Sequence, residues 1–217
     1  MMAVSYDEAV HTYIGLTIIT VAAVGALLVD RPNAPRWRQH AWLGLALLLA
    51  WIVMGSNESF TPPANGNAWW EPIKHLVTLS GADTWWGALR SPHVLQHKIS
   101  ALCIVTPAIT EWYIRRRPDH PASRYLRWVL PVALAGVAVV FVMHRPTHRH
   151  THGMMLFQDQ LRAELYQHWV FAAAFAAGAV ATLLSRIGPL PAGIRIPPRA
   201  WYAFLALGGL VFVTFRV

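Results

Sequence analysis

Residues 126–143, with the sequence LRWVLPVALAGVAVVFVM, decide the fold class of this chain. After Arg127 the stretch carries no charged side chain, and with polar flanks it approaches the roughly 20 residues needed to cross a hydrocarbon core of about 30 Å. The whole chain of 217 residues shares this character, with 55% hydrophobic residues, 13% charged residues and a mean hydropathy of +0.38. We therefore expect an integral membrane protein.

Five further apolar runs accompany this stretch. Together they predict an all-α, polytopic bundle of about six transmembrane helices that forms a single domain, residues 1–217. Trp42 and Trp51, near the two ends of the short second run, are typical of residues anchored at the membrane interface. Small residues in the first, fourth, fifth and sixth runs favour close packing of helices. The predicted spans are residues 10–29, 41–54, 93–114, 126–143, 168–185 and 200–215, and the outer loops are residues 55–92 and 144–167.

Basic residues are concentrated in the three connections that follow the first, third and fifth predicted spans. Eleven of the eighteen lie there with three acidic residues near them, whereas the other side of the predicted bundle has seven of each. The positive-inside rule places the arginine-rich connections in the cytoplasm and both termini outside it, in a bacterial periplasm. The chain begins without the basic region of a cleavable signal peptide, so we expect the first run to remain as a span of a multi-pass inner (cytoplasmic) membrane protein. The eleven are Arg31, Arg36, Arg38, Arg115, Arg116, Arg117, Arg124, Arg127, Arg186, Arg195 and Arg199.

The net charge of +8 therefore has a topological explanation. Arginines at the ends of apolar runs set the orientation in the membrane, so the expected partner is the lipid bilayer and no nucleic acid. Glu111 lies four residues before Arg115, which predicts an ion pair at the inner end of the third span. Cys103, the only cysteine, allows no internal disulfide and is expected to be a small buried hydrophobe.

The histidines are sorted to one side of this predicted topology. Nine of the eleven fall on the outer side, and only His40 and His120 fall on the inner side. Hydropathy does not require such sorting, because a neutral imidazole is tolerated at either interface. The distribution therefore predicts a site on the outer face. The nine are His11, His75, His93, His97, His144, His148, His150, His152 and His168.

Two pairs of these outer residues have helical spacing. His93 and His97 are four residues apart at the start of the third span and would share one helix face, as in helices that give two ligands to one metal. Glu164 and His168 repeat this spacing at the start of the fifth span, and Glu164 is either a ligand or an acceptor that orients the histidine. The alternative for His93 and His97 is a polar cap at the membrane interface.

The other candidate ligands lie near the ends of the remaining runs. His144 closes the fourth span and His11 opens the first, at the same predicted depth. The tract from His148 to His152 could gather a metal or form a solvated turn. Met154 and Met155 would favour Cu(I) over zinc, and their alternative is contact with the membrane surface. With His93, His97, His168 and Glu164, the candidate metal ligands include His11, His144, His148 and His152.

Two segments resemble a known family. SPHVLQH at residues 91–97, followed by Pro107, is similar to the HMxQH segment and later proline of the CtaG-type cytochrome oxidase assembly proteins. MHRP at residues 143–146, with QHWVF at residues 167–171, resembles their WHxP and EHxxF segments, although glutamine stands here for the glutamate. The resemblance covers roughly residues 91–185 and implies a copper-handling membrane protein. It implies copper binding by His93, His97, His144 and His168.

These observations favour a protein that binds copper in a periplasmic histidine cluster, for copper handling or for maturation of a copper enzyme such as cytochrome oxidase. A haem b protein or accessory subunit of an electron-transfer complex is the first alternative, with two histidines as axial ligands. An intramembrane zinc amide hydrolase or copper monooxygenase-like enzyme is the second, with Asp159 or Glu164 as base. A small subunit whose histidines bind lipid headgroups, quinone or a larger membrane complex is the third. No catalytic residue is assigned, and catalysis is the less favoured function.

Overall fold

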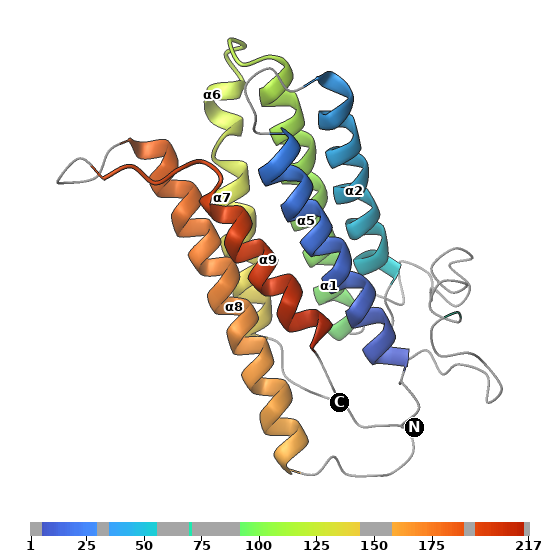
Figure 1. The fold of residues 1–217 in the computed structure, drawn as a ribbon. Helices are drawn as coiled ribbons and strands as arrows, with labels where there is room; N and C mark the ends of the chain where they lie inside the picture. Colours follow the sequence, from blue (N-terminus) through green and yellow to red (C-terminus); the bar gives the residue numbers. More distant parts are fainter. Residues whose placement is uncertain are drawn as a thin grey trace.

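The computed structural model describes residues 6–29, 35–55, 70, 92–143, 158–188 and 194–214, and all regular structure in these ranges is helical. All six predicted apolar runs are helices (Figure 1). The fold class expected from composition is therefore confirmed as all-α. The elements are α1 (Tyr6–Val24), η1 (Gly25–Val29), α2 (Arg36–Gly55), α5 (Pro92–Arg116), α6 (Ser123–Leu126), α7 (Val129–Met143), α8 (Gln158–Ile187) and α9 (Ala200–Val213).

Three stretches among the described residues are long and apolar enough to cross a membrane. They are Ala9–Leu27, Ser123–Met143 and Leu165–Ile187. Helix α9 is apolar but shorter, and α2 and α5 carry charged residues in their terminal turns. The chain is thus a membrane protein by the length and composition of its helices, with at least these three candidate spans.

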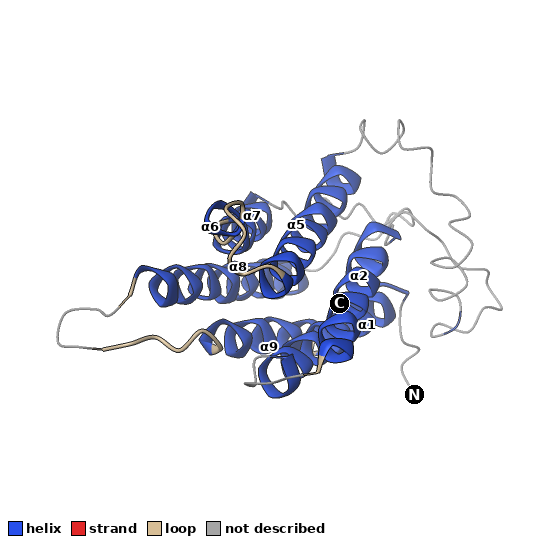
Figure 2. Ribbon diagram, turned by 90° about the horizontal axis from the view of Figure 1, so that it is seen from above, coloured by secondary structure: helices blue, strands red, loops and turns tan. Residues whose placement is uncertain are grey.

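The long helices form a closed ring. Each packs against the next one along the chain, α1 on α2, α2 on α5, α5 on α7, α7 on α8 and α8 on α9, and α9 then packs against α1 (Figure 2). Successive helices run in alternate directions, so α1 begins and α9 ends at the same end of the bundle (Figure 1). We call this the histidine end, and the opposite end, where α2 and α9 begin and α5 and α8 stop, the arginine end.

The ring has apolar side chains on both its inner and its outer surface. Inward positions recur with helical periodicity, as at Trp42, Ala46, Leu49 and Val53 of α2, all of which are buried. Large apolar side chains also point outward, such as Val132, which is 69% exposed on α7. A helix that is apolar all round is expected when lipid and not water surrounds the protein.

Glycines allow close backbone contact between α1 and α9. A Cβ built on Gly15 would lie 2.6 Å from the backbone oxygen of Gly209, and a Cβ on Gly209 would lie 2.8 Å from the backbone oxygen of Gly15. Real Cβ atoms do not approach backbone this closely, so both positions require glycine. The small residues expected to mediate helix contacts do so at this crossing.

Two helices begin well before the predicted spans. Helix α8 begins at Gln158, ten residues before the predicted start at His168, so the last part of the predicted loop 144–167 is helical. Its sequence QDQLRAEL is polar but rich in strong helix formers, which hydropathy does not detect. Helix α2 begins at Arg36, so Trp42 lies well inside it.

Candidate functional site

A cavity of about 140 Å³ lies inside the ring, and all six long helices contribute to its wall. Most of the lining side chains are aliphatic or aromatic. None of the described residues that line it is Asp, Glu, Lys or Arg. The lining includes Ile14, Ile18, Leu49, Val53, Ile104, Pro107, Leu134, Val137, Phe171 and Phe175.

The polar side chains of the cavity gather at the histidine end. His11 on α1, His97 on α5 and His168 on α8 all line it, with Gln96 and Ser100 of α5 beside them. His168 is buried, with 8% of its surface exposed, whereas His11 and His97 are partly exposed. Three histidines that are distant in sequence are therefore brought to one cavity, at the depth predicted for them.

Two of these histidine rings contact phenylalanine side chains. His11 stacks on Phe212 of α9 with the ring centres 5.7 Å apart, and His168 lies 6.0 Å from Phe141 of α7. Phe141 stacks in turn on Phe171, at 5.1 Å. These contacts pack two of the three imidazoles of the cavity against aromatic side chains. The phenylalanines were not among the predicted site residues, because aromatic residues in apolar runs give no distinguishing signal.

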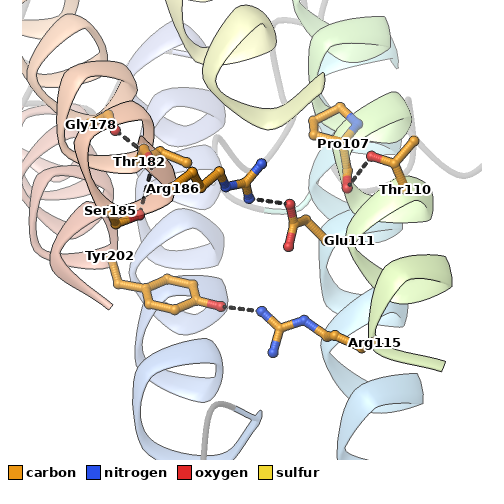
Figure 3. Close-up of polar contacts among 9 residues, drawn as sticks. All are labelled: Pro107, Thr110, Glu111, Arg115, Gly178, Thr182, Ser185, Arg186 and Tyr202. Carbon is orange, nitrogen blue, oxygen red and sulfur yellow. Dashed lines mark hydrogen bonds and ion pairs between the residues drawn. The ribbon is translucent and has the colours of Figure 1, made fainter. Parts of the chain in front are cut away.

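The arginine end of the ring is closed by buried polar contacts (Figure 3). Glu111 of α5 is 7% exposed and pairs with Arg186 of α8, the oxygen and nitrogen atoms lying 2.5 Å apart. Arg115 donates a hydrogen bond of 3.4 Å to the hydroxyl of Tyr202 on α9. The guanidinium of Arg115 also lies over the ring of Trp42, 5.7 Å from its centre.

These contacts correct two sequence-based predictions. Glu111 was expected to pair with Arg115, one turn away on the same helix, but it pairs with Arg186 across the ring. Trp42 was expected at the membrane interface, but it is 3% exposed and lines the cavity. The reason is the same in both cases: the side chains point to the interior of a closed bundle. Trp51 is 46% exposed, and its predicted position at the membrane interface stays a prediction.

The other candidate ligands are only partly covered by the structure. His93 lies in the first turn of α5 and Glu164 lies in α8, but their side chains are outside the described part. His144, His148 and His152 lie outside the described residues altogether. Among the described residues, no group of three or more His, Cys, Asp or Glu side chains is arranged to hold a metal ion.

Comparison with known proteins adds no assignment to this geometry. No protein-family model, curated protein or solved structure matches the chain significantly. The function must therefore be argued from the cavity and its histidine end.

Proposed function

We propose that this chain is a membrane protein that binds copper at the histidine end of its helix ring, and that it serves copper handling or the maturation of a copper enzyme such as cytochrome oxidase. The observation that carries the proposal is that His11, His97 and His168, from three helices, line one cavity. Imidazole suits copper, and the polarizable sulfur of methionine suits Cu(I). His97 and His168 are also two of the four histidines to which the CtaG-type resemblance assigns copper.

The metal would need ligands beyond those three histidines. Among the described residues, no three potential ligands are close enough together to hold a metal ion. The remaining donors would come from His93, in the first turn of α5, and His144, the residue after α7, since both helices have these ends at the histidine end. Glu164, one helical turn before His168, would supply a ligand or orient that imidazole. The bound metal supplies a soft Lewis-acid centre, and the chain's own residues hold it, orient it and keep it at one face.

The cavity also supports handling at one face rather than transport across the membrane. Below the histidines the wall is aliphatic and aromatic, and at the other end Glu111 and Arg186 close the ring. A metal ion that entered this apolar segment would lose its ligands and its hydration, which is costly at membrane depth. We therefore propose that copper is exchanged on the histidine side only.

Haem b is a weaker candidate for the same site. The described histidines of the cavity all lie at the histidine end of the ring. An electron relay across the membrane would need a second, deeper pair of axial ligands, which the described lining of the cavity does not contain. An intramembrane enzyme would need a base near the metal, and the candidates Asp159 and Glu164 have side chains outside the described part.

We further propose six membrane spans, with the arginine end in the cytoplasm and both termini in the periplasm of a bacterial inner membrane. Supporting this topology, ten arginines of the three basic connections lie among the described residues, at or beside the arginine end of the alternating helices. The three histidines of the cavity lie at the opposite end, where copper in the periplasm would reach them.

Copper titration of the purified protein tests the proposal. We expect one high-affinity Cu(I) site, and we expect His97→Ala and His168→Ala each to weaken it at least about tenfold, the lower bound for losing a group that supports a metal site. His120→Ala is the matched control, because His120 is exposed at the arginine end, where its Nδ1 accepts a hydrogen bond from the backbone N–H of Ala122.

Two results would contradict copper binding at this site. One is wild-type stoichiometry and affinity in both His97→Ala and His168→Ala. The other is a Soret band in the visible spectrum of the purified protein, which would assign the histidines to haem b. Zinc alone in the elemental analysis, together with hydrolysis of a lipid amide, would favour the enzyme alternative.

A further inference from the structure

The cavity below the histidines has no role in binding a metal ion, and its shape points to a second ligand. On α1 its lining extends from His11 to Val21, ten residues and about 15 Å at 1.5 Å per residue. On α5 it extends from Gln96 to Ala108, a similar length. This depth is about half of a hydrocarbon core of about 30 Å, which is the depth covered by one lipid leaflet.

The lining of this segment excludes most classes of ligand. Aliphatic and aromatic side chains from all six helices form it, and none of its described members carries a charge. Apolar cavities of comparable size stay dry and accept apolar molecules. A volume of about 140 Å³ spread over this depth is narrow, so a single linear chain fits it better than a ring system.

We infer that the cavity binds one linear hydrocarbon chain of a lipid, with its polar head among His11, His97 and His168. The buried imidazole of His168 and the partly exposed imidazoles of His11 and His97, with Gln96 and Ser100, offer hydrogen-bond donors and acceptors to a head group at the level of the membrane interface. The chain would extend past Phe171 and Phe175 toward Trp42. The hydrocarbon part of this inference does not depend on copper binding, because it uses the apolar segment below the histidines, whereas the head group would share His11, His97 and His168 with the proposed copper site.

Native mass spectrometry of the intact protein released from micelles tests this inference with two added probes, palmitic acid and palmitoyl-lysophosphatidylcholine. We expect one retained probe molecule per wild-type protein. Leu134→Trp should abolish retention, because Leu134 is 8% exposed and lines the cavity. Val132→Trp is the matched control, since Val132 on the same helix is 69% exposed and points away from the cavity.

A second variant keeps the test decisive if the tryptophan prevents folding. Ala108, 3% exposed on α5, also lines the cavity, so Ala108→Leu should fill part of it with a smaller change and lower retention at least about tenfold. Retention of either probe supports the inference, and the preferred one identifies a free fatty acid or a phospholipid as the source. Absence of retention in the wild type, or equal retention in all variants, would overturn it.

Discussion

At the scale of single residues, the ion pair between Glu111 and Arg186 is the interaction with the largest predicted effect on stability. Both side chains are largely buried, at 9% and 17% exposure, between α5 and α8. One nitrogen of Arg186 contacts Glu111, and its other terminal nitrogen has no hydrogen-bond partner among the described residues. The contact is therefore a single charged hydrogen bond and not the bidentate pair that a guanidinium can form with a carboxylate.

Removing one partner of this pair should destabilise the protein strongly. Arg186→Leu leaves the Glu111 carboxylate buried and uncompensated, and we expect a loss of about 3 kcal/mol or more in the free energy of unfolding. Arg186→Lys, which keeps the charge, should retain most of the stability. The double variant Glu111→Gln with Arg186→Leu should recover part of the loss. Thermal unfolding in detergent measures all three, and equal stability of Arg186→Leu and the wild type would contradict the assignment.

The same residues show the limit of sequence analysis at this scale. The sequence reveals that Glu111 and Arg115 are one turn apart, but it cannot show that a more distant arginine on another helix faces the carboxylate. Trp42 was assigned to the interface for the same reason. A tryptophan near the end of an apolar run is expected at the membrane interface when no neighbouring helices enclose its side chain. His11, His97 and His168 were better defined, because their shared depth follows from helix direction alone.

At the scale of helices, the crossing of α1 and α9 depends on two glycines. Gly15 and Gly209 face each other so closely that a Cβ on either would contact the other's backbone. Apolar side chains gain little by leaving lipid for another helix, so close van der Waals contact of this kind holds membrane helices together. Because α9 is the last helix and α1 the first, this crossing closes the ring around the cavity.

Gly209→Ala should therefore loosen the ring. The added methyl group would meet the backbone oxygen of Gly15 at 2.8 Å, and the required shift should cost about 1–3 kcal/mol, as overpacking of a core does. Gly44→Ala is the matched control, because a Cβ at Gly44 of α2 has no neighbour within 4 Å. We expect the control to match or slightly exceed wild-type stability in thermal unfolding. A similar loss in both variants would show that the crossing is not responsible, because alanine has a higher helix propensity than glycine and propensity alone would stabilise both variants.

Element boundaries were predictable where hydropathy alone decides them. The six apolar runs are helical in the part of the chain that the structure describes. An apolar stretch surrounded by lipid must satisfy its backbone hydrogen bonds internally, which favours a helix. The early start of α8 at Gln158 was missed because residues before Leu165 are polar and project beyond the apolar span. Their helix propensity was the available signal.

At the scale of the whole molecule, the closed ring was not predictable from one sequence. Helices that are apolar on every side give no amphipathic pattern to identify which face meets which neighbour. The sorting of nine histidines to one side predicted a site at that end, which stays a prediction, and the three described histidines that line the cavity lie at that end. The apolar segment below them could not be predicted, since its lining comes from six separate runs.

The proposed six-span topology makes opposite predictions for the two ends of the ring. In a Cys103→Ser background, Thr214→Cys lies at the exposed end of α9 on the histidine side, and His120→Cys lies in the exposed connection between α5 and α6. In intact bacterial cells a membrane-impermeant maleimide should label Thr214→Cys at once. His120→Cys should be labelled only after the cells are lysed.

Three helices, α7, α8 and α9, separate these two positions, so the positions lie on opposite sides if all three span the membrane and on the same side if α7 and α8 span it and α9 does not. Helix α9, with 14 residues, is the critical case, because it is shorter than the roughly 20 residues of an ordinary span. Protection of both positions in intact cells would show that α9 does not cross. The reverse labelling pattern would place the histidine end in the cytoplasm, and the copper source proposed for it would then have to be cytoplasmic.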